Sequence, residues 1–131
     1  MKVDINIPEI KNVTVVVKPE GGGEYWSVHL VNSNSFILKD ILVASKGYSQ
    51  KTPGREETSV IRQFFETLEA NTSMQIELID PEVFHLFNEY GVTYYINKEI
   101  YFKKFVFVPD SIHVGNLSHN KIMDADVVVH S

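Results

Sequence analysis

The sequence predicts an all-β protein, an immunoglobulin-like antiparallel β-sandwich of about seven to nine short strands. Three observations support this prediction. Apolar and polar residues alternate with a period of two in successive short segments. Turn residues separate these segments at close intervals, and no helical pattern alternates with them. With 131 residues and 44% hydrophobic content, the chain fits one domain with a sizeable core and leaves no room for a second domain.

The N-terminal half supplies the first predicted strands. Residues 3–7 alternate until a proline ends the run, which predicts a short edge strand. Residues 13–17 predict the next strand, with Val16 facing away from the three valines that point inward. The glycine-rich segment 18–24 predicts a hairpin loop, because no GK[ST] phosphate-binding sequence and no helix follow it. Residues 36–45 form a further apolar run.

The segment 59–68 fits two structures. Its apolar residues match helical spacing, but every neighbouring segment is a strand and a sandwich has no place for a helix there, so we predict a strand. Residues 74–78 alternate and predict the next strand. Asp80 suits a helix N-cap and Pro81 the first helical position, which predicts one short helical turn near 82–87.

Residues 84–108 form the most aromatic part of the chain and predict a β-hairpin with its turn at residues 97–98. The residues expected on one face are Val92, Tyr94, Ile96, Ile100 and Phe102. Phe105 and Phe107 join this face only if residues 103–104 form a bulge that shifts the alternation by one. Such an apolar hairpin must be covered by other strands.

Two aromatic residues have expected places in this fold. Tyr90 lies just before the predicted strand of Val92 and Tyr94, where immunoglobulin-type folds often place a tyrosine corner that bonds back to the preceding loop. Trp26 is expected as the central core aromatic. We assign the sandwich domain to residues 1–112. Residues 113–131 are predicted to be an irregular C-terminal tail, in which 127–129 can form a short edge strand.

Composition excludes several classes of function. The absence of cysteine excludes disulfides, thiolate metal sites and cysteine catalysis. The net charge is −5, and residues 66–131 carry four basic against ten acidic residues, so no basic face for nucleic acid is expected. The polar, charged N-terminus is unlike a signal peptide, and no apolar run reaches the length of a membrane span. We therefore expect a cytoplasmic protein that does not contact membranes.

No catalytic, cofactor or metal constellation stands out. The histidines lack the spacing of a zinc protease, the serines lack a G-x-S-x-G turn, and the 17 acidic residues define no pair. The polar residues of the tail with metal-binding chemistry are His113, His119, Asp124, Asp126 and His130. A solvated tail explains them better than a metal site, which needs a rigid second shell of ligands. We expect no enzymatic activity, no cofactor and no metal.

The long polar loop is the best candidate binding site. Its cationic and aromatic residues are Lys46, Tyr48, Lys51 and Arg62. Arginine could hold a phosphate or carboxylate by a bidentate fork and lysine as a point charge. An ordinary solvated loop, with its tyrosine packed on the end of the sandwich, is the competing interpretation.

Several segments resemble, in matching order, those of a small bacterial family of similar length. They are residues 4–8, 26–32, 45–48, 51–52, 58–59 with Arg62, 76–77, 88–93 and 104–107. Some members of that family are labelled phenylalanyl-tRNA synthetase subunit. The chain is far too short for a synthetase catalytic domain and has none of its motifs, so we take the label as a misannotation. The resemblance, which covers about residues 4–112, implies the fold and no activity.

Two hypotheses for the function follow. The first is a non-catalytic intracellular binding or assembly module with a protein partner or with itself, for example as a homodimer formed by outer sheet faces. The apolar residues expected on those faces are Tyr25, Val31, Tyr95, Tyr101 and Val106. The alternative is a small-anion or carbohydrate-binding domain that uses the loop 46–62.

Overall fold

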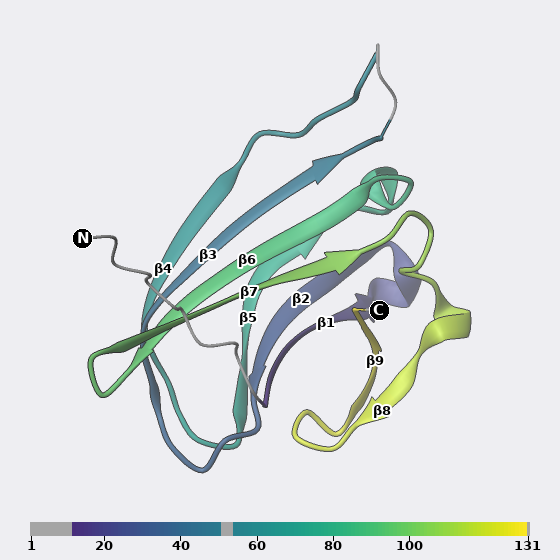
Figure 1. The fold of residues 1–131 in the computed structure, drawn as a ribbon. Coiled ribbons are helices and arrows are strands. Elements are labelled where there is room, and N and C mark those ends of the chain that lie inside the picture. Colours follow the sequence, from purple (N-terminus) through teal and green to yellow (C-terminus); the bar gives the residue numbers. More distant parts are fainter. Residues whose placement is uncertain (1–11, 51–53, 131) are drawn as a thin grey trace, which may run out of the picture.

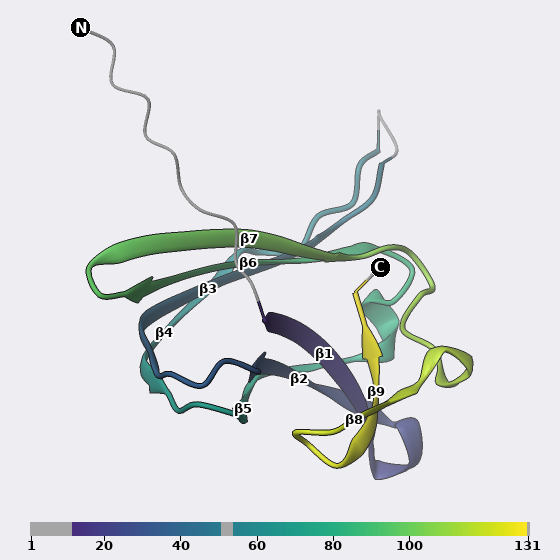
Figure 2. The ribbon, with the colours of Figure 1, turned by 60° about the horizontal axis from the view of Figure 1, so that its bottom comes forward.

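A computed structural model of the chain describes residues 12–50 and 54–130. It confirms the all-β sandwich: two antiparallel sheets, one of five strands in the order β5-β2-β1-β9-β8 and one of four in the order β4-β3-β6-β7, lie face to face (Figures 1 and 2). The strands are β1 (Val13–Glu20), β2 (Tyr25–Asn32), β3 (Leu38–Tyr48), β4 (Ile61–Leu68), β5 (Thr72–Ile79), β6 (Phe87–Ile96), β7 (Glu99–Phe107), β8 (Ser118–Asn120) and β9 (Ala125–Val129). Single 3-10 turns are η1 (Gly21–Gly23), η2 (Pro81–Val83) and η3 (Val114–Asn116).

The strand order is that of an immunoglobulin-type sandwich. Strands β1, β2 and β5 correspond to A, B and E, and strands β3, β6 and β7 correspond to C, F and G, with β4 added beside C. Strands β9 and β8 extend the first sheet beyond β1. The predicted strand of residues 3–7 lies outside the described residues.

The β1–β2 hairpin follows its predicted pattern. Its turn is η1, whose three glycines all have positive φ, a conformation that costs glycine little. Val13, Val15 and Val17 point into the main core, which also buries Trp26 as expected. The Trp26 ring meets Phe84 edge to face, with ring centroids 5.6 Å apart.

The opposite face of β1 is covered by the C-terminal strands. Val16, Val31 and Val127 form a second buried cluster, and Ile122 and Met123 pack against it. Val31 is therefore buried and is not part of an exposed outer face, contrary to the sequence-based expectation. The segment predicted as an irregular tail contains β8 and β9, and β9 hydrogen-bonds to β1 in the interior of the five-stranded sheet. The possible strand at 127–129 thus belongs to β9, and the sheet edge is β8.

Strand β4 confirms the prediction of a strand for residues 59–68. It pairs in regular register with β3, from Leu38 opposite Leu68 to Ser45 opposite Ile61. The helical spacing of its apolar residues arises because β4 is an edge strand that also carries apolar residues on its outer face, where Phe64 is 59% exposed.

The β6–β7 hairpin corrects one expectation. Asn97 and Lys98 both have positive φ, as in a two-residue type I′ turn. This turn pairs Ile96 with Glu99 and Tyr94 with Tyr101, and the register continues without a bulge. The inward row of β7 is therefore Tyr101, Lys103, Phe105 and Phe107. Ile100 and Phe102 face outward instead, and Tyr101, stacked on Tyr94 with centroids 5.4 Å apart, is not on the outer face.

The predicted helical turn after β5 is present and short. The Asp80 carboxylate accepts a hydrogen bond from the Glu82 N–H over 2.8 Å, and Pro81 occupies the first position of η2. The turn ends at Val83, and β6 begins at Phe87, so it starts earlier and is shorter than the predicted 82–87. In the described part of the chain, no helix is long and apolar enough to cross a membrane.

Candidate functional site

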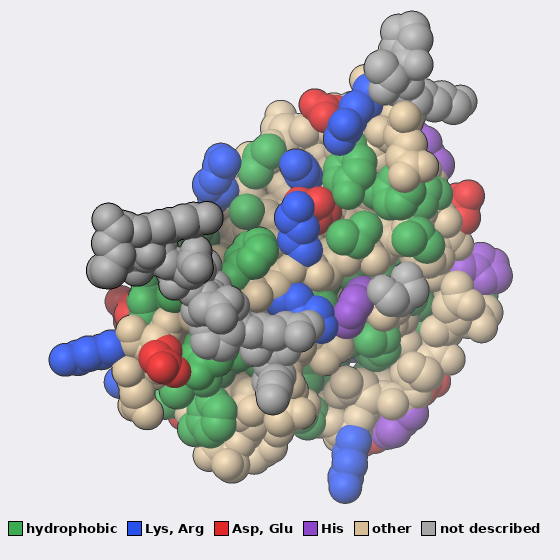
Figure 3. Space-filling view, in the orientation of Figure 1, with side chains coloured by type: hydrophobic (Ala, Val, Ile, Leu, Met, Phe, Trp, Pro, Cys, Tyr) green, Lys and Arg blue, Asp and Glu red, His purple; other side chains and the backbone are tan. Residues whose placement is uncertain are grey.

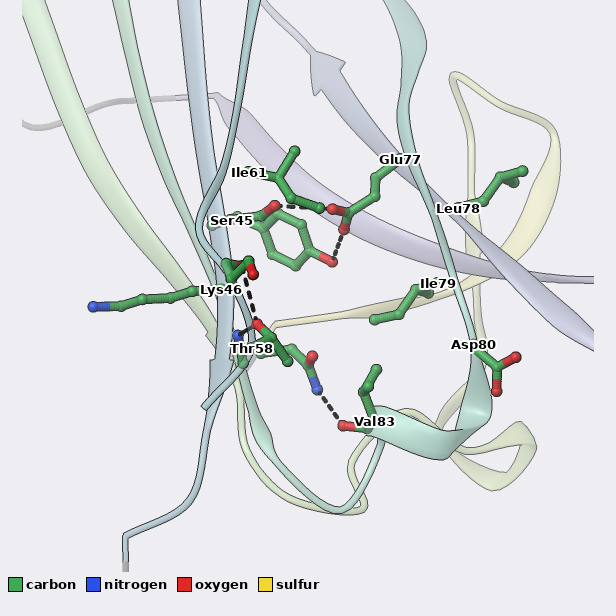
Figure 4. Close-up of a pocket in the computed structure, with 13 residues that line it drawn as sticks. Ser45, Lys46, Thr58, Ile61, Glu77, Leu78, Ile79, Asp80 and Val83 are labelled. Carbon is green, nitrogen blue, oxygen red and sulfur yellow. Dashed lines mark hydrogen bonds between the residues drawn. The ribbon is translucent and has the colours of Figure 1, made fainter. Parts of the chain in front are cut away.

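A cavity of about 240 Å³ lies at the open side of the sandwich, where β3 and the start of β4 face β5 (Figure 4). Its lining residues are Ser45, Lys46, Gly47, Thr58, Ser59, Ile61, Glu77, Leu78, Ile79, Asp80, Val83, Asn88 and Tyr90. The two ends of the loop 46–62 therefore form one wall, and the strand that carries Glu77 forms the other.

A β-bulge directs Glu77 into the sandwich. Val28 of β2 lies opposite Glu77, but the next residue, His29, lies opposite Gln75, so Ile76 is an extra residue in β5. Val28 is fully buried in the core, and its cross-strand partner Glu77 faces the same side. Ile76 is buried as well. Bulges are often found where a strand must redirect a functional side chain.

Two residues from the opposite sheet hold the Glu77 carboxylate. The Ser45 hydroxyl donates to Oε1 over 2.9 Å, and the Tyr90 hydroxyl donates to Oε2 over 2.7 Å (Figure 4). Tyr90 is only 2% exposed. Burial raises the pKa of Tyr90 well above its usual value, and the neighbouring Glu77 charge raises it further. Tyr90 therefore stays protonated and donates to Glu77.

This bond replaces the tyrosine corner that the sequence predicted. The acceptor of the Tyr90 hydroxyl is the Glu77 side chain on β5 of the other sheet, not the backbone of the loop before β6. Because that acceptor is only partly buried, it can also accept hydrogen bonds from a molecule in the cavity.

Hydrogen bonds that involve both side chains and the backbone fix the remaining walls. The Gly47 N–H donates to the Thr58 hydroxyl over 2.7 Å, and the Thr58 N–H donates back to the Gly47 carbonyl over 2.8 Å. Asn88 closes the other end by donating its side-chain N–H to the carbonyls of Val83 and Leu86, at 3.0 and 3.2 Å. The cavity thus combines apolar walls with a carboxylate, the composition of a small-ligand site.

The candidate anion-binding residues do not converge on this cavity. The Lys46 side chain turns away from it (Figure 4), and its Nζ lies 3.9 Å from Glu89 Oε2. The Tyr48 hydroxyl donates to Glu89 Oε1 over 3.2 Å. Arg62 lies in β4 opposite Ala44, and its side chain makes no hydrogen bond or ion pair with another described residue. Lys51 lies outside the described residues.

Three residues outside the set of candidate anion-binding residues belong to the same group in the structure. Glu89, only 9% exposed, lies directly opposite Lys46 in the β3–β6 ladder. Lys104 Nζ lies 3.9 Å from Glu89 Oε1, and the Arg55 guanidinium lies 4.9 Å from the centre of the Tyr48 ring. The Glu89 carboxylate therefore lies between Lys46 and Lys104 and compensates part of their charge. Only the register of the strands brings Lys46, Glu89 and Lys104 together.

The outer face of the four-stranded sheet combines this group with exposed apolar side chains. Leu42, Phe64, Tyr95 and Phe102 are all exposed there. Figure 3 shows apolar side chains interspersed with lysine and arginine over this face. The Tyr95 side chain keeps its expected outward place, and Val106 is half-buried.

The polar residues of the C-terminal segment pair with one another. The two ring nitrogens of His119 lie 3.4 Å from Asp124 and 3.5 Å from Asp126. His130 meets the Phe105 ring edge to face at 4.8 Å. Within residues 12–50 and 54–130, no three side chains of His, Asp or Glu come together as a metal site would require.

Comparisons with known proteins give no match. No protein-family model matches the chain. No curated protein and no solved structure matches it either. The resemblance to the small bacterial family therefore stays a prediction.

Proposed function

We propose that this protein is a non-catalytic binding module and that the cavity beside Glu77 is its ligand site. The observation that supports this most is the state of the Glu77 carboxylate. It is partly buried, held by Ser45 and Tyr90, and has no ion pair among the described residues. A carboxylate in such a setting favours a ligand that donates hydrogen bonds.

The ligand class follows from the charge and size of the cavity. The ionisable side chains that line it are Glu77, Asp80, Tyr90 and Lys46, and Lys46 turns away (Figure 4). A small molecule with hydroxyl or ammonium groups is therefore favoured over an anion. The volume of about 240 Å³ is below the ~300–1,000 Å³ of pockets for drug-sized ligands, which favours a compact polyol, monosaccharide or amine.

The sequence-based alternative is a small-anion or carbohydrate-binding domain that uses the loop 46–62. This proposal keeps the carbohydrate as a ligand and moves the binding site to the cavity beside Glu77. The loop 46–62 contributes through its two ends, at Gly47 and Thr58, rather than through its cations. An anion site built on Lys46 and Tyr48 is less favourable, because Glu89 already occupies the position between them.

Thermal unfolding in the presence of single compounds tests the proposal. The panel should hold neutral monosaccharides and polyols, primary amines such as ethanolamine, and inorganic phosphate and sulfate. A ligand at about 100 times its Kd stabilises by about 2.7 kcal/mol. For 131 residues this raises the Tm by about 10 °C. We expect such a shift with a polyol, sugar or amine and none with phosphate.

Two variants make the test specific to the cavity. Glu77→Gln should abolish the shift, because it removes the charge while keeping the shape of the side chain. Glu99→Gln is the matched control, since Glu99 also accepts a hydrogen bond from a tyrosine, Tyr101, at 3.0 Å, but on the surface of the β6–β7 hairpin. The proposal would be contradicted if no compound in the panel raised the Tm. It would also be contradicted if a compound raised the Tm of Glu77→Gln as much as that of the unmodified chain.

A further inference from the structure

The ends of the two sheets leave four strand edges, and three of them carry features that discourage pairing with another strand. Strand β7 has Lys103 in its inward row and Lys104 on its outer face. Strand β5 is interrupted by the bulge at Ile76. Strand β8 has only three residues. Inward charges, bulges and short edge strands are the usual means by which proteins protect sheet edges.

The fourth edge, β4, has none of these features. It has eight residues, Ile61–Leu68, without proline, glycine or lysine, and it keeps one register with β3, in which only Glu66 has no paired residue. No other described strand pairs with its outer edge (Figure 1). Two of its apolar residues are exposed, Ile61 to 49% and Phe64 to 59%. A long, regular and apolar edge of this kind is a template for an added strand.

We propose that β4 pairs antiparallel with β4 of a second copy of the chain, about a two-fold axis at Phe64. In that register Arg62 lies opposite Glu66 of the second copy, and Glu66 lies opposite Arg62 of the second copy. Strand β4 would then join two four-stranded sheets into one continuous sheet of eight strands.

Charge complementarity selects this register and this partner. Arg62, Phe64 and Glu66 alternate along β4 and therefore share its outer face. Arg62 and Glu66 are exposed, and neither forms an ion pair within residues 12–50 and 54–130. Each lies two residues from Phe64, so the two-fold axis creates two equivalent ion pairs around a Phe64 pair. An axis moved by one residue to Gln63 or Phe65 would leave both charges without an opposite charge across the strands.

The same pairing brings the second copy next to one wall of the proposed ligand cavity. In this register Ile61 would lie opposite Thr67 of the second copy. Ile61 lines the cavity beside Glu77. The dimer does not depend on a bound ligand, so the two proposals can fail separately.

Charge reversal tests the pairing in solution. We expect sedimentation equilibrium of the full chain to give a dimer. Arg62→Glu places Glu opposite Glu66, and Glu66→Arg places Arg opposite Arg62, so each variant should raise the dimer Kd by at least about tenfold. The double variant restores two opposite pairs and should restore the dimer. A mixture of the two single variants should form a heterodimer tighter than either homodimer, because both of its cross-strand pairs are again opposite in charge.

Controls of equal charge change come from exposed sites far from β4. Lys121→Glu, in the segment between β8 and β9, matches Arg62→Glu, and Glu24→Arg, at the turn between β1 and β2, matches Glu66→Arg. Both controls should dimerise like the original chain. A chain that stays monomeric at all concentrations would overturn the proposal. This holds whatever else covers the edge of β4, whether residues 1–11 or another protein. The proposal would also be overturned if the control variants weakened the dimer as much as Arg62→Glu and Glu66→Arg do.

A disulfide reports the register directly, because the chain has no cysteine of its own. Phe64→Cys puts two thiols opposite each other, with Cα atoms about 4.5–5.5 Å apart, within the range of a disulfide. Thr67→Cys puts the thiols six residues apart along the strands, roughly 20 Å. Mild oxidation should therefore cross-link Phe64→Cys and not Thr67→Cys. The reverse result would show a different register and overturn the proposal.

Discussion

Replacement of Tyr90 by phenylalanine isolates one bond of the candidate site. The Tyr90 ring meets Phe107 edge to face, with ring centroids 6.1 Å apart, and phenylalanine keeps that contact. The hydroxyl that donates to Glu77 Oε2 over 2.7 Å is lost. The difference in the free energy of unfolding between the two proteins therefore measures this hydrogen bond.

The size of the effect follows from the surroundings of Glu77. A hydrogen bond to a charged group contributes roughly 1.5–3 kcal/mol. Glu77 is only partly buried and keeps its bond from Ser45, so we expect the lower end, about 1.5 kcal/mol. An unfolding entropy of roughly 2.1 cal/mol/K per residue gives about 0.28 kcal/mol/K for 131 residues. The Tm should therefore fall by about 5 °C.

Calorimetry and urea unfolding at one protein concentration measure this difference, since a dimer would make the Tm depend on concentration. Tyr101→Phe is the control. Tyr101 also donates to a glutamate, Glu99, over 3.0 Å, but water can replace the hydroxyl at that surface site, so its Tm should stay unchanged. If Tyr90→Phe were as stable as the unmodified chain, or lost no more stability than Tyr101→Phe, the Tyr90–Glu77 hydrogen bond would not stabilise the fold, contrary to this prediction.

Two further predictions concern pH and the C-terminal strands. Burial, and to a lesser extent Tyr101, raises the pKa of Tyr94 from 10.0 to about 12. Because the pKa is higher in the folded state, this contribution to stability is complete below pH 10 and is lost as the pH rises through 12, so Tyr94→Phe should flatten the decline in urea unfolding over that range. An equal decline in both proteins would contradict this. Ending the chain at Ile112 uncovers Val16 and Val31, which are nearly fully buried, and should lower the Tm and increase the binding of a hydrophobic dye. An unchanged Tm would instead support a domain that ends at residue 112.

The sequence predicted the strands because their pattern is local. Alternation over five residues placed Val13, Val15 and Val17 inward and Val16 outward, and both cores of the structure follow that division. The turn chemistry of Asp80 and Pro81 is local as well, and the structure shows the expected N-cap bond. Residues 59–68 needed the context of their neighbours, because their spacing alone favoured a helix.

The candidate site could not be predicted in the same way. Glu77 appears in the sequence as the polar member of an alternating run, and only the bulge against β2 turns it inward. Its partners Ser45 and Tyr90 are 32 and 13 residues away in the sequence. The cations of the loop 46–62 likewise gave no indication of Glu89, which lies on a different strand.

The sequence by itself determined that this chain is a β-sandwich, where most of its strands lie and that no cysteine chemistry is possible. Only the tertiary structure decided which residues meet: Tyr94 with Tyr101, Glu77 with Tyr90, and β9 with β1. The physical reason is the two-residue period of a strand. A change of one residue in register moves every side chain to the other face of the sheet, and the register is set by partner strands that are distant in the sequence.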